Sequence, residues 1–170
     1  NAGLAIAQES WMRLGQVSGR RIVVLVGPGN NGSDGLIAAR QLSEWQAVVQ
    51  CYALVSRNDE QWQATVDTGI TCINVTADDS ELTTLTQWLA DADLIIDALL
   101  GTGHQRPIDG MLAEILRKLR EVRKGASPPQ LIAVDIPTGI NADNGSSDPL
   151  TVKVDETVTF ECAKVGLYSQ

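Results

Sequence analysis

The stretch RRIVVLVGPGNNGSDG, residues 20–35, indicates how this chain folds. Its first half is a continuous apolar run ending in glycine, the pattern of a strand buried on both faces of a parallel sheet. Gly27, Gly29 and Gly32 then satisfy G-x-G-x-x-G, the glycine spacing of a dinucleotide-binding turn. A buried strand that ends in such a turn predicts the opening unit of a parallel α/β sheet.

The rest of the chain repeats this alternation of strands and helices. Strands are expected at residues 20–27, 47–56, 71–75, 93–101, 130–139 and 156–160, and helices at residues 34–45, 58–67, 80–90 and 109–125. The alternation predicts an α/β fold of three layers, Rossmann-like and doubly wound around a mainly parallel sheet. We expect one domain over residues 1–170. Because the chain starts with a helix-like segment and without Met, it is interpreted as a fragment that lacks residues upstream.

Composition limits the classes of partner. The chain has 170 residues and a formal net charge of -8, which argues against a general affinity for nucleic acid or for an anionic membrane. No signal peptide or transmembrane run is recognisable. The three cysteines show no metal or redox spacing and are interpreted as reduced thiols, which favours a cytoplasmic location: Cys51, Cys72 and Cys162. The tryptophans lie on expected helices and are interpreted as packing residues: Trp11, Trp45, Trp62 and Trp88.

Polar, glycine-bearing turns follow three of the expected strands: GPGNNGSDG, DALLGTGHQRP and DIPTGINADNG. In a sheet ordered 3-2-1-4-5 these strands are neighbours, and the winding reverses between the first and the fourth, where such sheets bind ligands. Asp97 and Asp135 interrupt the apolar runs of the fourth and fifth strands. A buried carboxylate costs several kcal/mol unless it is paired, hydrogen-bonded or bound to a cation, so both are candidate functional residues. For His104 and Arg106, substrate contact and a purely structural role remain equal alternatives.

A dehydrogenase is the first alternative that the glycine spacing raises. It requires an acidic residue at the end of the second strand, about 20 residues beyond the glycines. Here Asp59 comes late, and Arg57 would at best favour a 2′-phosphate. Pro28 removes an amide from the turn, and three residues add side-chain oxygens that suit a hard cation or a polyhydroxylated ligand: Asn30, Asn31 and Asp34. The spacing is therefore weak evidence for hydride transfer.

Three motifs together resemble one family. GPGNNGSDGLIAAR, LIIDALLGTG and AVDIPTGINADNG are similar, in order and spacing, to the NAD(P)H-hydrate epimerases, also called YjeF N-terminal domains, and the match runs from NAGLAIA to FECAKVGL. The resemblance implies epimerisation at C6 of the hydrated nicotinamide ring of NADHX or NADPHX. It also implies a partner, an ADP- or ATP-dependent dehydratase that acts on the S form and is commonly a second domain of the same polypeptide in bacteria. The family is often dimeric, so a homodimer is a further expectation.

The resemblance assigns roles residue by residue. It places the first substrate segment on Asn30, Asn31, Gly32, Ser33 and Asp34, and the second on Gly101, Thr102, Gly103, His104, Gln105, Arg106 and Pro107. It makes Asp135 a substrate-binding aspartate and assigns a potassium ion to Asn31, Asp97 and Thr138. Two positions depart from the family pattern. Thr138 replaces a usual serine and keeps the ligand oxygen, whereas Ser33 replaces a usual glycine and either weakens binding or adds a hydrogen bond.

The hydrated ring suggests a mechanism. Its nitrogen can expel the C6 hydroxyl once an acid protonates it, and water can return to either face of the planar iminium. We expect Asp135 to be the general acid and base, since it ends a strand in the crevice and is not assigned to the ion. Ring opening and reclosure is another route. The alternative functions are an NAD(P)-dependent oxidoreductase and a non-catalytic scaffold like that of mRNA decapping enhancers or of the apolipoprotein-binding relative in animals. Retention of Asn31, Asp97 and Asp135 favours the enzyme.

Overall fold

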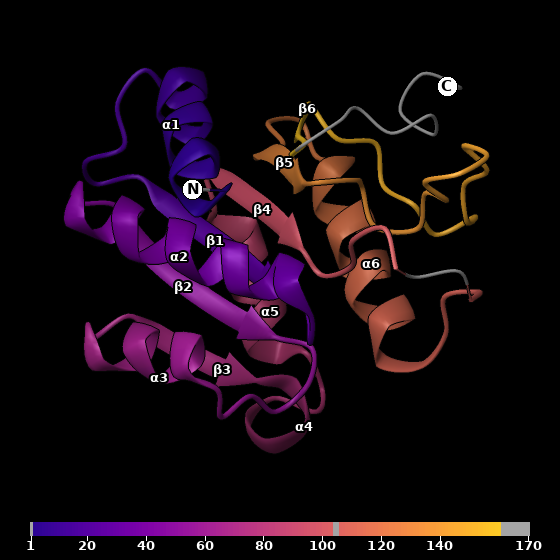
Figure 1. Cartoon of the computed structure of the whole chain (residues 1–170), viewed down its shortest axis with the longest axis horizontal. Coiled ribbons are helices and arrows are strands. Elements are labelled where there is room, and N and C mark those ends of the chain that lie inside the picture. The colour runs from indigo at the N-terminus through magenta and orange to yellow at the C-terminus, as the bar shows by residue number, and fades with distance from the viewer. Residues whose placement is uncertain (1, 104–105, 161–170) are drawn as a thin grey trace.

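A six-stranded, entirely parallel sheet forms the centre of the protein, in the order β3-β2-β1-β4-β5-β6 (Figure 1). The computed structural model describes residues 2–103 and 106–160. The strands are β1 (Arg21–Val26), β2 (Val48–Ala53), β3 (Thr71–Asn74), β4 (Leu94–Ala98), β5 (Gln130–Val134) and β6 (Glu156–Val158). The expected order of the first five strands is confirmed, and β6 lies parallel beside β5.

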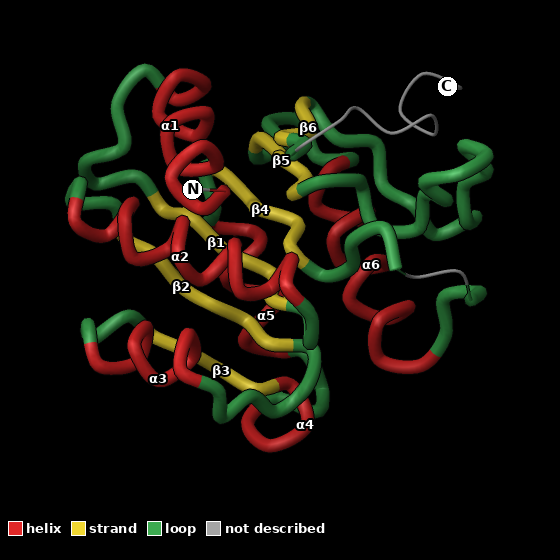
Figure 2. The backbone as a smooth tube through the Cα atoms, viewed as in Figure 1, coloured by secondary structure: helices red, strands yellow, loops and turns green. Residues whose placement is uncertain are grey.

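Helices cover both faces of the sheet and complete three layers (Figures 1 and 2). They are α1 (Ala2–Leu14), α2 (Asn30–Glu44), α3 (Glu60–Asp67), the short α4 (Val75–Asp78), α5 (Thr83–Asp91) and α6 (Gly110–Arg123). Alternate side chains of β1 enter opposite cores, because successive residues of a strand point to opposite faces. Val24 packs with α1, α2 and α3, whereas Val23 and Leu25 pack with α5 and α6. The doubly wound fold is confirmed.

Several element boundaries differ from expectation, and two of them shape the site. Helix α2 begins at Asn30 rather than at residue 34, with Gly29 as its N-cap, so the polar segment is the first helical turn. Asn and Ser are weak helix formers because their side chains compete for backbone hydrogen bonds, and here long-range contacts override that preference. Strand β5 ends at Val134 because Asp135 adopts a left-handed conformation, φ 66°. Helix α5 begins at Thr83, after the left-handed Leu82.

The expected packing role holds for some of the aromatic and sulfur side chains. Trp62 and Trp88 are buried against opposite faces of the sheet. The packing prediction is wrong for Trp11, which is 52% exposed because it occupies the outer side of α1. Its ring centroid lies 6.5 Å from that of Trp45. Cys51 is buried and Cys72 half-buried, both with free thiols, while Cys162 lies outside the described residues. Within the described ranges no helix is long and apolar enough to cross a membrane.

Candidate functional site

Asn31 joins the carboxyl ends of the three central strands. Its position in the first turn of α2 follows directly from the end of β1. Its side-chain amide donates to the Leu100 carbonyl at 3.0 Å, just beyond β4, and to the Val134 carbonyl at 2.8 Å, at the end of β5. The three strand ends expected to converge therefore meet at one side chain.

Asp97, the last but one residue of β4, lies behind this junction and is 3% exposed. Its Oδ1 accepts hydrogen bonds from the Thr138 hydroxyl at 2.7 Å and from the Leu99 amide at 3.2 Å, and its Oδ2 accepts from the Thr138 amide at 2.9 Å. Burial raises the pKa of Asp97, and the hydrogen bonds from Thr138 and Leu99 only partly oppose that rise. The protein thus holds a carboxylate whose charge is incompletely compensated by its own donors.

The groups around Asp97 form a set of oxygen donors that fits a singly charged hard cation. Thr138 is 2% exposed, and its hydroxyl also accepts from the Leu100 amide at 3.2 Å, which links the loops after β4 and β5. The Asn31 side chain reaches the same two loops. Such cations take carboxylate, hydroxyl, amide and carbonyl oxygens as ligands. In residues 2–103 and 106–160 no cluster of three or more His, Cys, Asp or Glu side chains offers a more highly charged metal site.

Two further carboxylates lie close enough to each other for the charge of one to affect the other. Asp135 directly follows Val134, is half-buried, and accepts from the Thr159 hydroxyl at 3.4 Å. Asp34 lies one helical turn beyond Asn31 and therefore on the same side of α2. Burial, and next the charge of Asp135, raise the pKa of Asp34. The Asp34 carboxyl therefore holds a proton more readily than an exposed aspartate does. The left-handed backbone of Asp135 is a conformation that non-glycine residues adopt at a cost, often at functional sites.

An open hollow of about 380 Å³ brings the two expected substrate segments together. Asn30 and Asn31 line one side of it, and Gly101 to Gly103 line the other. The last residues of the second segment lie elsewhere: Arg106 and Pro107 line a separate hollow of about 310 Å³ with residues 139–141 and 146–149. His104 and Gln105 lie outside the described residues. The structure therefore joins the first part of the second segment to α2 and places its end beside the loop after β5.

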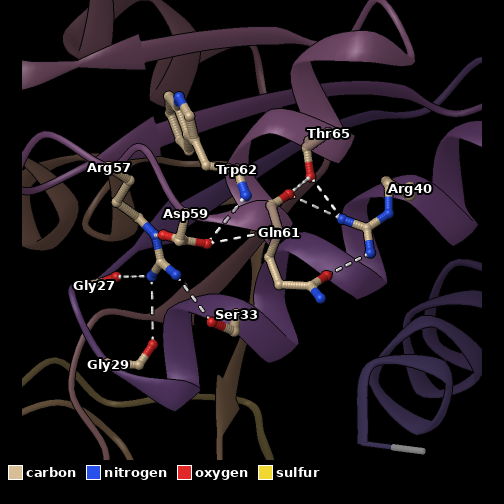
Figure 3. Close-up of polar contacts among 9 residues, drawn as sticks. All are labelled: Gly27, Gly29, Ser33, Arg40, Arg57, Asp59, Gln61, Trp62 and Thr65. Atoms are coloured by element: carbon tan, nitrogen blue, oxygen red, sulfur yellow. Dashed lines mark hydrogen bonds and ion pairs between the residues drawn. The ribbon is translucent and has the colours of Figure 1, made fainter.

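Two glycines of the G-x-G-x-x-G turn lie against other atoms of the protein, which leave no room for a side chain. A side chain at Gly27 would overlap the Leu99 carbonyl, and one at Gly32 would overlap the Gly27 carbonyl and lie 2.6 Å from Nη1 of Arg57. Arg57 is itself engaged, because its guanidinium bonds to the turn and to Ser33 (Figure 3). The role of Arg57 as a 2′-phosphate ligand is thus not supported. No pattern in the sequence indicates the contacts that Arg57 makes, because they join residues 24 to 30 positions apart.

These features define a Rossmann-like domain with a polar crevice at the carboxyl ends of β1, β4 and β5. Comparison with known proteins then identifies the family. The model of the YjeF-related protein N-terminus matches residues 1–166, so the chain belongs to this family.

Two relatives agree with this assignment, and one solved structure shares the fold. The chain is 36% identical to the bifunctional NAD(P)H-hydrate repair enzyme Nnr of Thermofilum pendens, over 98% of this chain and 31% of that protein. It is 35% identical to the NAD(P)H-hydrate epimerase of Oenococcus oeni, over 89% of this chain and 68% of that protein. The crystal structure of yeast ynu0 matches in fold with a TM-score of 0.83, at 22% identity over 98% of this chain and 71% of that one. The chain spans about a third of the length of the bifunctional relatives.

Proposed function

We propose that this domain is an NAD(P)H-hydrate epimerase, which interconverts the R and S forms of NADHX and NADPHX at C6 of the nicotinamide ring. The names of its relatives support this reaction. The observation that carries the proposal is the interaction of Asp34 with Asp135, which directly follows Val134, a residue whose carbonyl accepts from Asn31. Two neighbouring carboxylates, of which Asp34 has a raised pKa, suit a reaction that needs both an acid and a base.

Asp135 is proposed as the general acid and base. Its carboxyl group protonates the C6 hydroxyl, the C6–O bond breaks, and the electron pair of the ring nitrogen forms the planar iminium. Water then adds to either face and returns its second proton to the carboxylate. Asp34, whose pKa is raised by burial and by Asp135, serves as a proton reservoir beside it. A positioned acid–base group of this kind contributes about 10²–10⁴-fold to the rate.

Two segments are proposed to bind the nucleotide. Asn30 to Asp34 form the first turn of α2, where free backbone amides and the helix dipole favour a phosphate. Gly101 to Gly103 face them across the hollow, with His104, Gln105, Arg106 and Pro107 extending the segment. NADHX and NADPHX are both included as substrates, since Arg57 is occupied and offers no evident selection for a 2′-phosphate.

A potassium ion is part of the proposal, and Asn31, Asp97 and Thr138 would hold it. The ion would supply a fixed positive charge beside the substrate segments. The raised pKa of Asp97 supports this assignment, because a cation compensates the charge that burial disfavours. A dehydratase that consumes the S form is the proposed functional partner, as the bifunctional names of relatives suggest. A cytoplasmic location and a homodimer are further proposals, testable by fractionation and by sedimentation.

Substitution of Asp135 tests the assignment. Asp135→Asn keeps the size of the side chain and removes its acid–base function, so epimerisation should fall about 10²–10⁴-fold. Asp143→Asn, on the exposed loop after β5, is the matched control and should retain wild-type activity. An Asp135→Asn rate within a few-fold of wild type would show that another group carries the proton. A titration with ordinary NADH and NADPH that detected hydride transfer would instead support the oxidoreductase alternative.

A further inference from the structure

Arg57 connects the segment after β2 to the first turn of α2 (Figure 3). Its Nη1 donates to the Gly27 carbonyl at 2.6 Å and to the Gly29 carbonyl at 3.3 Å, and its Nη2 donates to the Ser33 hydroxyl at 2.9 Å. These contacts span both ends of the glycine turn. One guanidinium therefore fixes the path of the chain from the end of β1 into α2.

The Arg57 guanidinium is itself held in place by the carboxylate of Asp59. Nε of Arg57 donates to Asp59 at 2.7 Å, and the other carboxylate oxygen of Asp59 accepts from the Gln61 and Trp62 amides at the start of α3 (Figure 3). The Arg57 pair holds the pKa of Asp59 below its usual value. The Arg57 side chain is only 5% exposed. Arg57 and Asp59 therefore link the glycine turn to the N-terminus of the packed helix α3.

The turn depends on this support because its own residues supply little. Pro28 has no amide hydrogen, and Gly29, the N-cap of α2, has no side chain with which to cap the helix. Gly32 fits only because it lacks the Cβ that would meet the Gly27 carbonyl and Arg57. The geometry of the segment is therefore imposed by a long-range contact.

We propose that Arg57 is a positioning residue for the substrate segment, acting through Ser33 and the two glycine carbonyls. It holds residues 30–34 in the conformation that binds the hydrated nucleotide, an inference that rests on the proposed function. All three guanidinium nitrogens are engaged with protein groups, so Arg57 acts on the substrate only through the turn. Lysine cannot replace it, because one ammonium cannot span the contacts that the planar fork makes.

Kinetic constants of three variants test the proposal. Arg57→Lys should raise KM for the hydrated nucleotide about tenfold or more and change kcat less than threefold, since hydrogen bonds to a charged group are stronger than those between neutral groups. Ser33→Ala should raise KM about threefold. In the double variant the two effects should be clearly less than additive, because the serine hydroxyl has no guanidinium to bind once Arg57 is gone.

Arg40→Lys is the matched control. Arg40 also bridges helices, with hydrogen bonds to the Gln61 carbonyl, the Gln61 side chain and the Thr65 hydroxyl, but it does not contact the turn (Figure 3). Arg40→Lys should lower thermal stability and leave KM within twofold of wild type. Equal KM values for Arg57→Lys and Arg40→Lys would overturn the proposal, as would additive effects of Arg57→Lys and Ser33→Ala. If Arg57→Lys fails to fold, Ser33→Ala decides: an unchanged KM overturns the proposal.

Hydrogen exchange of the free protein separates this proposal from the proposed function. Amides of residues 29–34 should exchange at least tenfold faster in Arg57→Lys than in wild type, and at the wild-type rate in Arg40→Lys. If the wild-type protein shows no epimerase activity while this exchange pattern holds, the function is wrong and the role of Arg57 in shaping the turn stands. If the wild type is active and exchange is equal in both variants, the role of Arg57 is wrong.

Discussion

Asp97 and Asp79 are two buried aspartates at the same edge of the sheet, and they differ in how their charge is compensated. Asp79 is 7% exposed and lies beyond β3, while Asp97 is 3% exposed at the end of β4. Asp79 accepts from the Leu85 amide at 2.9 Å, the Thr84 amide at 3.1 Å and the Tyr52 hydroxyl at 3.0 Å. Each carboxylate thus accepts at least three hydrogen bonds, so counting partners does not distinguish them.

The direction of the pKa shift distinguishes them. Burial raises the pKa of Asp79, but hydrogen bonds from Leu85, Thr84 and Tyr52 outweigh it and bring the value below its usual range. For Asp97, burial outweighs the bonds from Thr138 and Leu99, and the pKa is raised. Asp79 also lies at the start of α5, where the helix dipole favours a negative charge. Asp79 is therefore a structural cap, whereas the hydrogen bonds of Asp97 compensate its charge incompletely.

The largest predicted difference is in activity. Asp97→Asn removes the charge proposed to hold the ion, so kcat/KM for epimerisation should fall about 100-fold. Asp79→Asn alters a cap remote from the substrate segments and should stay within threefold of wild type. Epimerisation kinetics at saturating potassium measure both. Equal losses in the two variants would abolish the distinction between a functional and a structural aspartate.

The next prediction concerns stability. Asp79→Asn places an amide NH₂ where the carboxylate accepts from Leu85, Thr84 or Tyr52, so the free energy of unfolding should fall by about 2 kcal/mol. The exposed control Asp143→Asn should change it by less than about 0.5 kcal/mol. Urea unfolding followed by circular dichroism provides the measurement. A loss no larger than that of the control would mean that Asp79 does not cap α5.

Removal of potassium should have a smaller effect that depends on Asp97 alone. Ligand binding to the folded state adds RT ln(1 + [L]/Kd), about 1.4 kcal/mol at a tenfold excess over Kd, which corresponds to roughly 4 °C for a chain of this size. Replacing potassium by choline should therefore lower Tm by about 4 °C in the wild type and in Asp79→Asn. Asp97→Asn should show no such shift. A shift of equal size in Asp97→Asn would mean that potassium does not bind at Asp97.

The smallest effect is on the pH dependence of stability without potassium. The pKa of Asp79 is lowered, so its contribution is present above the usual value of 3.8 and is lost as the pH falls through the lowered value. The pKa of Asp97 is raised, so its contribution is full below 3.8 and is lost as the pH rises through the raised value. On acidification from pH 7, the stability of the wild type should first rise relative to Asp97→Asn. Its advantage over Asp79→Asn should shrink only below about pH 4. The same trend in both comparisons would contradict the assigned directions.

Much of the fold and part of the site follow from the sequence. Apolar runs with glycine ends locate β1, β4 and β5, and the winding rule for parallel sheets brings their carboxyl ends together. Asp97 and Asp135 are recognisable because each interrupts such a run. Asp79 escapes this reasoning, since it stands in a short polar segment and its partners are backbone amides of a helix whose start the sequence does not mark.

Side-chain contacts between distant segments were beyond prediction. Arg57 and Ser33 are 24 residues apart, and no periodicity links them. The start of α2 at Asn30 also depends on distant segments. The side-chain amide of Asn31 donates hydrogen bonds to carbonyls 69 and 103 residues away, whereas the local propensity of this segment favours a loop. The proximity of Asp34 to Asp135 follows from that shifted start.

The central claim is that the carboxyl ends of β1, β4 and β5 form an epimerase site. Its most direct test is the conversion of purified R-NADHX to S-NADHX by the wild-type protein in potassium buffer, followed by chromatography against the spontaneous reaction. We expect an acceleration of at least about 100-fold, the minimum that one positioned acid–base group supplies. A conversion rate equal to the spontaneous one would contradict it.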